Sequence, residues 1–375
     1  MEETVRTLQT ELQEPVKEIE DGILGETPGR GEIDISSHYV KSTELLGDYV
    51  SLDWQHIGDM MRIMENIGSY ARDMKRRRPL NIILQAEPGS GKSHFIKCLA
   101  EKMSSCEVKA VVFNMTAMER MDDLAAALEA VRNLKVNDKL PLLFLDEFDS
   151  CERNYPPLLP LMWDGTLQVG HRHLEVGKVI IVLAGSQKNI VGAMEASKAM
   201  RKVTSDGASK LVDLLSRING GTLAIPGLDE IVDGDRLGAA HRNRKVDKVC
   251  VSVSLLLRRF DGVEEVPWAL LNFISRTTFR YGVRSISNLI DHIPLMSRGV
   301  QRLRVANLKA LPLGNTEAIK VSDLAHHIIS EDGPAAVEGL WRRLRAISKL
   351  VRIREKKEEP LSSVDSFVRF LWGKR

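Results

Sequence analysis

The chain has 375 residues, of which 43% are apolar, and this is enough material for two or three domains with packed cores. This composition excludes a chain that is disordered throughout. Because 53 lysines and arginines are balanced by 51 aspartates and glutamates, the net charge of +2 predicts no global attraction to nucleic acid or membranes, so any such affinity has to be local. The four cysteines are too few and too widely spaced for a zinc knuckle or a disulfide framework, and we expect reduced, packed thiols.

The first residues contain neither the basic segment nor the apolar segment of a secretion signal. No run of the sequence approaches the roughly 18 apolar residues that a membrane span needs. We therefore expect a soluble, cytoplasmic protein with no membrane partner.

Residues 1–45 are predicted to form an acidic N-terminal arm. Within it Val5, Leu8 and Leu12 keep helical spacing as far as Pro15. Two interpretations stay open for this arm: a solvated segment, or a short helix that binds a partner.

Residues 46–228 have the pattern of an α/β domain. Apolar residues recur at helical spacing over 54–74, and Pro79 ends this helix. Beyond it, short apolar runs alternate with helical stretches, which is typical of a parallel sheet covered by helices. The predicted strands of this five-stranded sheet are 81–85, 109–113, 140–145, 178–184 and 222–225.

From residue 229 the strand signals fade, and we expect an all-helical lid domain over 229–300. Its clearest predicted helices are 251–260, 268–279 and 285–296. Residues 301–375 are predicted to form a helical C-terminal extension with a basic face, ending in a short helix over 364–372.

A glycine-rich turn, Ala-Glu-Pro-Gly-Ser-Gly-Lys-Ser, occupies residues 86–93 between the first strand and a helix. Such a turn holds phosphates, because its glycines let backbone N–H groups point inward and the helix N-terminus adds partial positive charge. Lys92 is expected to reach the terminal phosphates of ATP, and Ser93 to offer its hydroxyl to Mg²⁺. Ala86 replaces the usual first glycine, which serves the turn and not the phosphate. The predicted nucleotide-binding residues are Glu87, Pro88, Gly89, Ser90, Gly91, Lys92, Ser93, His94 and Asp146.

Two carboxylates, Asp146 and Glu147, follow the apolar third strand and are expected at the carboxyl edge of the sheet. Asp146 is predicted to hold Mg²⁺ together with Ser93, and Glu147 to polarise the attacking water as general base. Alone, an acidic pair in this position is mostly a helix cap. The phosphate-binding turn earlier in the chain favours the catalytic interpretation.

With these two motifs the chain resembles the AAA+ ATPases over residues 46–300. The resemblance implies a polar first sensor after the fourth strand, for which we favour Ser186 over Gln187. It also implies a second sensor that reaches the phosphates from the lid. Arg284 is our candidate, although Arg276 and Arg280 lie close by in the sequence.

The same resemblance implies an arginine finger at Arg217, just before the fifth strand. Such a finger stabilises transition-state charge only on the ATP of a neighbouring subunit, so it implies a ring or spiral homo-oligomer. The alternative is a surface arginine that closes a helix.

Residues 166–177 alternate around a glycine and predict a hairpin before the fourth strand. It resembles the hairpin that one AAA+ subgroup inserts before the first sensor. His171, Arg172 and His173 would form a tip basic enough to meet a phosphate backbone or an acidic peptide. Metal binding by the two histidines is disfavoured because no carboxylate or thiol at ligand spacing completes a site.

We therefore expect a Mg²⁺-dependent, ATP-hydrolysing oligomeric motor or loader that acts on a macromolecular client. A nucleic-acid client is supported by the hairpin tip and by basic segments at 241–245 and 342–357. Base stacking has little support, because aromatic residues make up only 5% of the chain. The alternative is an ATP-controlled assembly switch that recruits a protein partner or effector, as in defence or transposition systems. A protein-remodelling ATPase is weakened because residues 116–123 lack the aromatic loop that grips a threaded chain.

Overall fold

The computed structural model describes residues 2–11, 13–19, 32–34, 44–150, 155–185, 212–228, 239–259, 265–267, 270–271, 274–275, 277–279, 281–291 and 316–318. The chain divides into two units, one of residues 1–7 and 53–227 and the other of residues 8–52 and 228–375. Within the described residues, no helix combines the length and the apolar character that crossing a membrane requires.

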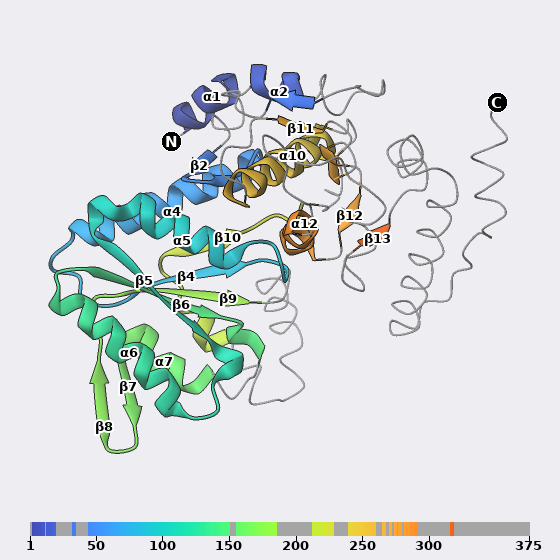
Figure 1. Cartoon of the computed structure of the whole chain (residues 1–375). Coiled ribbons are helices and arrows are strands. Elements are labelled where there is room, and N and C mark those ends of the chain that lie inside the picture. The colour runs from blue at the N-terminus through green and yellow to red at the C-terminus, as the bar shows by residue number, and fades with distance from the viewer. Residues whose placement is uncertain are drawn as a thin grey trace, which may run out of the picture. The chain divides into compact units, whose positions relative to one another are not determined.

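A five-stranded parallel sheet forms the centre of the first unit (Figure 1). Its order in space is β10-β4-β9-β6-β5, so the fifth strand along the chain lies beside the first, followed by the fourth, third and second. The five predicted strands are confirmed, with ends shifted by one or two residues: β4 (Leu80–Gln85), β5 (Val108–Asn114), β6 (Leu140–Asp146), β9 (Ile180–Gly185) and β10 (Gly221–Ala224).

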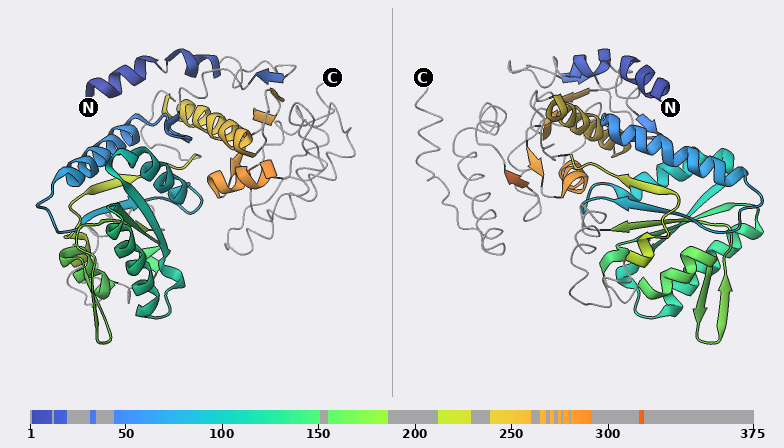
Figure 2. Two further views of the ribbon diagram at one scale, coloured as in Figure 1. Left: turned by 60° about the vertical axis from the view of Figure 1, so that its left-hand side comes forward. Right: turned by 180° about the vertical axis from the view of Figure 1, so that it is seen from behind.

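Helices cover both faces of this sheet, α4 and α5 on one side and α6 and α7 on the other (Figures 1 and 2). Short 3-10 turns follow α5, β5 and β6. The helices are α4 (Trp54–Arg72), α5 (Lys92–Lys102), α6 (Met121–Val136) and α7 (Tyr155–Asp164), and the turns are η2 (Met103–Cys106), η3 (Met115–Ala117) and η4 (Phe148–Ser150).

A large part of the core of the first unit lies between the sheet and the α6–α7 layer. Because successive strand residues point to opposite faces, alternate residues of β6 and β9 face this layer. Leu143 and Leu183 are fully buried there in one cluster with Leu128 of α6 and Leu158 of α7. Burial on both faces explains why the inner strands are almost continuously apolar.

A hairpin of β7 (Thr166–Val169) and β8 (Arg172–Glu175) extends away from the sheet, as predicted (Figure 1). Leu167 and Leu174 pair across it and are buried in the same core. Gly165 closes its root at φ +69°, where a Cβ atom would lie only 2.9 Å from the backbone nitrogen of Gly177. Only glycine fits this close approach without a shift of the backbone.

Helices α10 and α12 dominate the described part of the second unit, which supports its predicted helical character. Three short antiparallel strand pairs accompany them, and two of their strands, Glu265–Pro267 and Thr278–Phe279, lie within residues 229–300, so this region is not purely helical. The elements are α2 (Gln13–Ile19), α10 (Ala239–Arg259) and α12 (Gly282–Asp291), with β1 (Glu32–Asp34) paired to β11 (Glu265–Pro267), β2 (Glu44–Leu46) to β3 (Tyr49–Val50), and β12 (Thr278–Phe279) to β13 (Thr316–Ala318).

Two predicted helices differ from the structure. The helix expected over 268–279 is wrong at its end, because Thr278 and Phe279 form β12, as suits β-branched and aromatic residues. The helix expected to stop at Pro15 is instead two helices, α1 (Glu2–Glu11) and α2, with Pro15 in the first turn of α2, where proline is tolerated. The predicted helices beyond residue 318 lie outside the described residues.

Charged residues of α10 are buried in the second unit and have partners. The carboxylate of Asp247 accepts a hydrogen bond from the backbone N–H of Leu52 at 2.6 Å. Lys248 donates from Nζ to the carbonyl of Thr277 at 2.7 Å. These hydrogen bonds connect α10 to Leu52, which follows β3, and to Thr277, which precedes β12. They also offset the cost of burying the charges.

Candidate nucleotide-binding site

The glycine-rich turn connects the carboxyl end of β4 to the start of α5. Gly89 has φ +84° and Gly91 has φ +93°, a left-handed conformation that strains other residues. Gly91 is the N-cap of α5 and carries no side chain that could occupy the first N–H groups of the helix. These groups are therefore suited to bind an anion.

Two buried polar atoms at this turn have no hydrogen-bond partner among the described residues: Oγ of Ser90 and Nε2 of Gln85. Buried polar groups are normally paired, so these two atoms are donors that stay available to a ligand. Gln85 was missed in the sequence, because one glutamine at the end of an apolar strand belongs to no motif.

Lys92 connects three strands of the sheet. Its side chain is only 8% exposed, and its Nζ donates to the carbonyl oxygen of Gly185, the last residue of β9, at 3.1 Å. The same Nζ lies 3.5 Å from Oδ1 of Asp146, the last residue of β6. The structure thus brings together the lysine of the turn and the first carboxylate, and the pairing offsets the cost of burying the ammonium group.

The second carboxylate follows in an uncommon backbone conformation. Glu147 has φ +54°, and its N–H donates to Oδ1 of Asp146 at 3.0 Å. The next residue, Phe148, is fully buried in the core. A left-handed conformation costs a residue with a Cβ atom about 1 kcal/mol, and here the core and the Asp146 side chain impose it.

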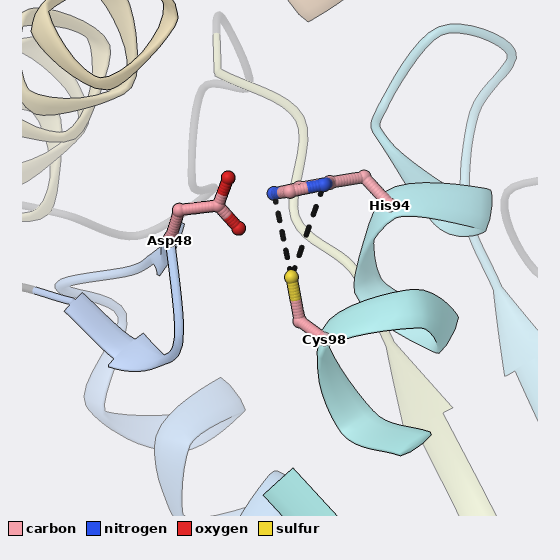
Figure 3. Close-up of side chains that lie close together, drawn as sticks. All are labelled: Asp48, His94 and Cys98. Carbon is pink, nitrogen blue, oxygen red and sulfur yellow. Dashed lines mark hydrogen bonds between the residues drawn. The ribbon is translucent and has the colours of Figure 1, made fainter. Parts of the chain in front are cut away.

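Ser93 and His94 lie in the first turn of α5. Ser93 is exposed and His94 half-buried. The ring nitrogens of His94 lie 3.6 and 3.8 Å from Sγ of Cys98, one helical turn further on (Figure 3). The imidazole therefore extends along α5.

Arg217 lies just before β10. Its Nη1 donates to the carbonyl of Asp213 at 2.7 Å, and its own carbonyl accepts from Nδ2 of Asn81 at 2.9 Å. Asn81 is fully buried and also donates to the carbonyl of Met162 at 2.8 Å. Asn81 thus fixes the backbone of Arg217, a positioning role that no sequence motif indicated.

The remaining predicted site residues lie outside the described residues or in the second unit. Ser186 and its alternative Gln187 lie outside the described residues, as do Arg276 and Arg280. Arg284 is exposed in the first turn of α12, in the second unit, and its N–H donates to the carbonyl of Tyr281 at 3.1 Å.

The basic surfaces predicted from sequence differ in their exposure. His171, Arg172 and His173 are all exposed at the end of the β7–β8 hairpin, as expected of its tip. The prediction of a basic surface for nucleic acid at 241–245 is wrong at Arg244, which is 7% exposed. Its guanidinium lies 3.8 Å from the carboxylate of Asp247. A buried, paired guanidinium is not available to a nucleic acid.

Residues 82–155 match the family model described as AAA, the ATPase family associated with various cellular activities. Among curated proteins, none matches the sequence. Similar solved structures include the Hsp104–ADP complex of S. cerevisiae, with 14% identity and a TM-score of 0.42 over 68% of this chain, which spans only 46% of that one. Others are Cdc6p from Pyrobaculum aerophilum, with 12% identity and a TM-score of 0.45 over 91% of each chain, and the ADP form of the ORC2 protein of Aeropyrum pernix, with 14% identity and a TM-score of 0.41 over 84% of each.

A parallel sheet that carries a P-loop after its first strand and an acidic pair after its third defines a P-loop nucleotide-binding domain. The family match falls on this part of the chain. Residues 82–155 are thus similar to the AAA family of P-loop ATPases.

Proposed function

We propose that the protein is a Mg²⁺-dependent ATPase that hydrolyses ATP to ADP and phosphate. The observation that carries this proposal is the 3.5 Å approach of Lys92 Nζ to Asp146 Oδ1 beside a glycine turn with left-handed φ angles. A buried lysine next to a carboxylate, with the unpaired Ser90 hydroxyl close by in the sequence, suits a site for phosphates and a cation.

Each residue at the turn has a proposed task. Lys92 holds the terminal phosphates, and the backbone from Glu87 to His94 surrounds the phosphate chain. Ser93 and Asp146 offer the hydroxyl and carboxylate oxygens that Mg²⁺ prefers. When bound, Mg²⁺ neutralises charge that develops on the phosphate oxygens. Glu147 orients the attacking water and accepts its proton.

Three further residues complete the proposed catalytic set. Ser186 is proposed as first sensor and Arg284 as second sensor. Arg217 is proposed as a finger that acts on the ATP of a neighbouring subunit, which requires a homo-oligomer in a ring or spiral. Its present bond to the Asp213 carbonyl would then be exchanged for a phosphate contact.

For the client we propose a macromolecule that the oligomer remodels or loads, with nucleic acid favoured. The exposed basic tip at His171, Arg172 and His173 supports this client. An ATP-controlled switch that recruits a protein partner would use the same nucleotide site. The two differ in whether nucleic acid changes the rate of hydrolysis.

Steady-state ATP hydrolysis by the purified chain tests both statements. We would measure it alone and with single-stranded DNA, duplex DNA or RNA, at low and moderate salt, with Lys92→Ala as the inactive control. If the wild type hydrolyses ATP and Lys92→Ala does not, the ATPase activity is supported. If a nucleic acid stimulates hydrolysis severalfold and this stimulation fades with salt, the nucleic-acid client is supported. Hydrolysis equal in the wild type and in Lys92→Ala would contradict the first, and unchanged turnover with all three polymers would favour the protein-partner switch.

A further inference from the structure

A basic loop lies between α4 and β4, away from the nucleotide site. Residues 72–78 contain five cations, Arg72, Lys75, Arg76, Arg77 and Arg78, against one acid, Asp73. The loop stands at the amino end of β4, whereas the P-loop follows the carboxyl end. Six strand residues at about 3.3 Å each separate the two by about 20 Å.

Tyr70 holds two of the nearby cations in place. Its ring lies 5.1 Å from the guanidinium carbon of Arg76 and 5.2 Å from Nζ of Lys178, both distances that favour a cation–π contact. The hydroxyl of Tyr70 accepts from the N–H of Val179 at 2.9 Å and lies 3.0 Å from the carbonyl of Arg78. The ring is 1% exposed, so it forms a fixed base under the loop.

The other end of the loop is also fixed. The guanidinium carbon of Arg78 lies 4.2 Å from the centre of the Trp163 ring, and Trp163 is 45% exposed. Lys178 donates to the carbonyls of Ala71 at 3.0 Å and Asp73 at 2.8 Å. Three cations are therefore held by rings or backbone, while Lys75 and Arg77 extend into solvent.

We infer that this amino-edge cluster, composed of Arg72, Lys75, Arg76, Arg77, Arg78 and Lys178, binds the phosphate backbone of duplex nucleic acid. The inference goes beyond the proposed ATPase activity and does not require it. The cluster is rich in guanidinium groups, which match phosphate with paired hydrogen bonds. Cations held at fixed positions suit a regular array of phosphates, because less side-chain freedom is lost on binding.

The aromatic rings argue for a duplex and against unpaired bases. Tyr70 is buried, and one face of Trp163 already lies against Arg78. Single-strand binding depends on free aromatic faces on which bases stack. A bilayer would need apolar side chains to insert, and the described cluster offers only Met74, 85% exposed, besides the half-covered Trp163.

Charge reversal at the two solvent-facing residues tests the inference. The full chain with Lys75→Glu and Arg77→Glu would be compared with wild type by fluorescence anisotropy on a labelled duplex of about 30 base pairs over a range of salt, without nucleotide. Lys109→Glu with Arg132→Glu is the matched control, because both residues are exposed cations of the same unit and the change in net charge is identical. A thermal melt checks that each variant is folded.

We expect the cluster variant to lose at least about tenfold in duplex affinity, and its slope of log affinity against log salt to fall by about 2, since each phosphate contact contributes about 0.9. The control variant should keep most of the affinity. Equal losses in both variants, or none in either, would overturn the inference. The inference would also be overturned if the chain bound a labelled single strand more tightly than the duplex. It would be overturned too if the charge reversal weakened binding to vesicles containing phosphatidylserine and left duplex binding unchanged. Because no nucleotide is present, these outcomes are independent of whether the chain hydrolyses ATP.

Discussion

The ammonium group of Lys92 lies 3.5 Å from Oδ1 of Asp146, although the two residues belong to segments separated by a full βα unit. The strand order explains this approach. Strand β9 lies between β4 and β6, and the carbonyl of Gly185 at its end accepts from the same ammonium group. The lysine is thus held at the carboxyl edge of the sheet before any phosphate arrives, and the site is preorganised.

Replacing Lys92 by alanine should weaken nucleotide binding by roughly 100-fold, because a charge-assisted contact is lost and the Asp146 carboxylate then faces the phosphates without a counter-charge. Titration calorimetry with ATP measures the loss. Lys97→Ala is the control, since Lys97 lies on the same helix with its side chain 73% exposed. Nucleotide affinity equal to wild type in Lys92→Ala would remove this lysine from the site.

Glu147→Gln should keep ATP binding and lower turnover by roughly 100-fold or more, the usual contribution of a general base. The amide has the shape of the carboxylate but does not accept the proton of the water. Binding and single-turnover hydrolysis, measured on the same preparation, separate the two effects. Turnover at the wild-type rate would exclude Glu147 as the base.

Glu147→Gly provides a second readout at the same position. Glycine adopts φ +54° without strain, which favours the folded state by about 1 kcal/mol, but the freedom of glycine in the unfolded chain offsets about 0.4–1 kcal/mol of this gain. Glu147→Gly should therefore lose turnover while staying as stable as Glu147→Gln in urea unfolding. A clear loss of stability in Glu147→Gly alone would show that the left-handed conformation stores no strain.

Arg217→Ala should bind ATP and fail to hydrolyse it, because the proposed finger acts on a neighbouring subunit. Mixing it with Glu147→Gln subunits, which contribute intact fingers, should restore part of the hydrolysis at the Arg217→Ala sites. Steady-state turnover of the two variants, alone and mixed, is the measurement. Full activity of Arg217→Ala alone would return Arg217 to the role of a residue that closes a helix.

The elements and the P-loop could be predicted because their signals are local. Apolar runs mark the five strands, and the spacing of Gly89, Gly91 and Lys92 marks the turn. Positions that depend on distant partners could not be predicted. Asn81 looks like a defect in a strand until Met162 and Arg217 supply its partners.

Burial and backbone conformation were equally hidden in the sequence. Arg244 belongs to a basic segment that resembles a solvated surface, yet the packing of α10 buries it near Asp247. The left-handed φ of Glu147 arises from Phe148 in the core and the Asp146 side chain, which no residue pattern encodes. Tertiary contacts decide such features.

Tyr70 should make the stability of the first unit depend on pH at the alkaline end. Burial raises the pKa of Tyr70 from 10.0 to about 12, opposed in part by the Val179 hydrogen bond and by Arg76. The unfolded chain releases the proton near pH 10, whereas the folded chain keeps it, so the folded state binds more protons between these values. The contribution is complete below pH 10 and is lost as the pH rises through about 12.

At most about 3 kcal/mol is involved in this pH dependence. Urea unfolding of wild type and Tyr70→Phe across this range measures it. Phenylalanine cannot ionise, so the stability advantage of the wild type should shrink as the pH rises from 10 towards 12. An advantage that stays constant over the range would show that the hydroxyl titrates alike in both states.

Gly165→Ala should destabilise the root of the β7–β8 hairpin more than Gly170→Ala destabilises its tip. Both glycines have positive φ, +69° and +56°, so each variant carries a similar backbone strain of about 1 kcal/mol. At Gly165 the new Cβ would also lie 2.9 Å from the nitrogen and 3.0 Å from the oxygen of Gly177, whereas at Gly170 no described atom lies within 4 Å.

The contact at Gly177 involves backbone, which moves only with the hairpin itself. We therefore expect Gly165→Ala to cost roughly 2 kcal/mol and Gly170→Ala about half as much, measured by urea unfolding of the two variants side by side. Equal losses of unfolding free energy in the two variants would mean that the backbone at Gly177 shifts to accommodate the new Cβ atom without a measurable cost. Since Lys178 follows this root directly and donates to the α4–β4 loop, Gly165→Ala should also weaken duplex binding by the amino-edge cluster.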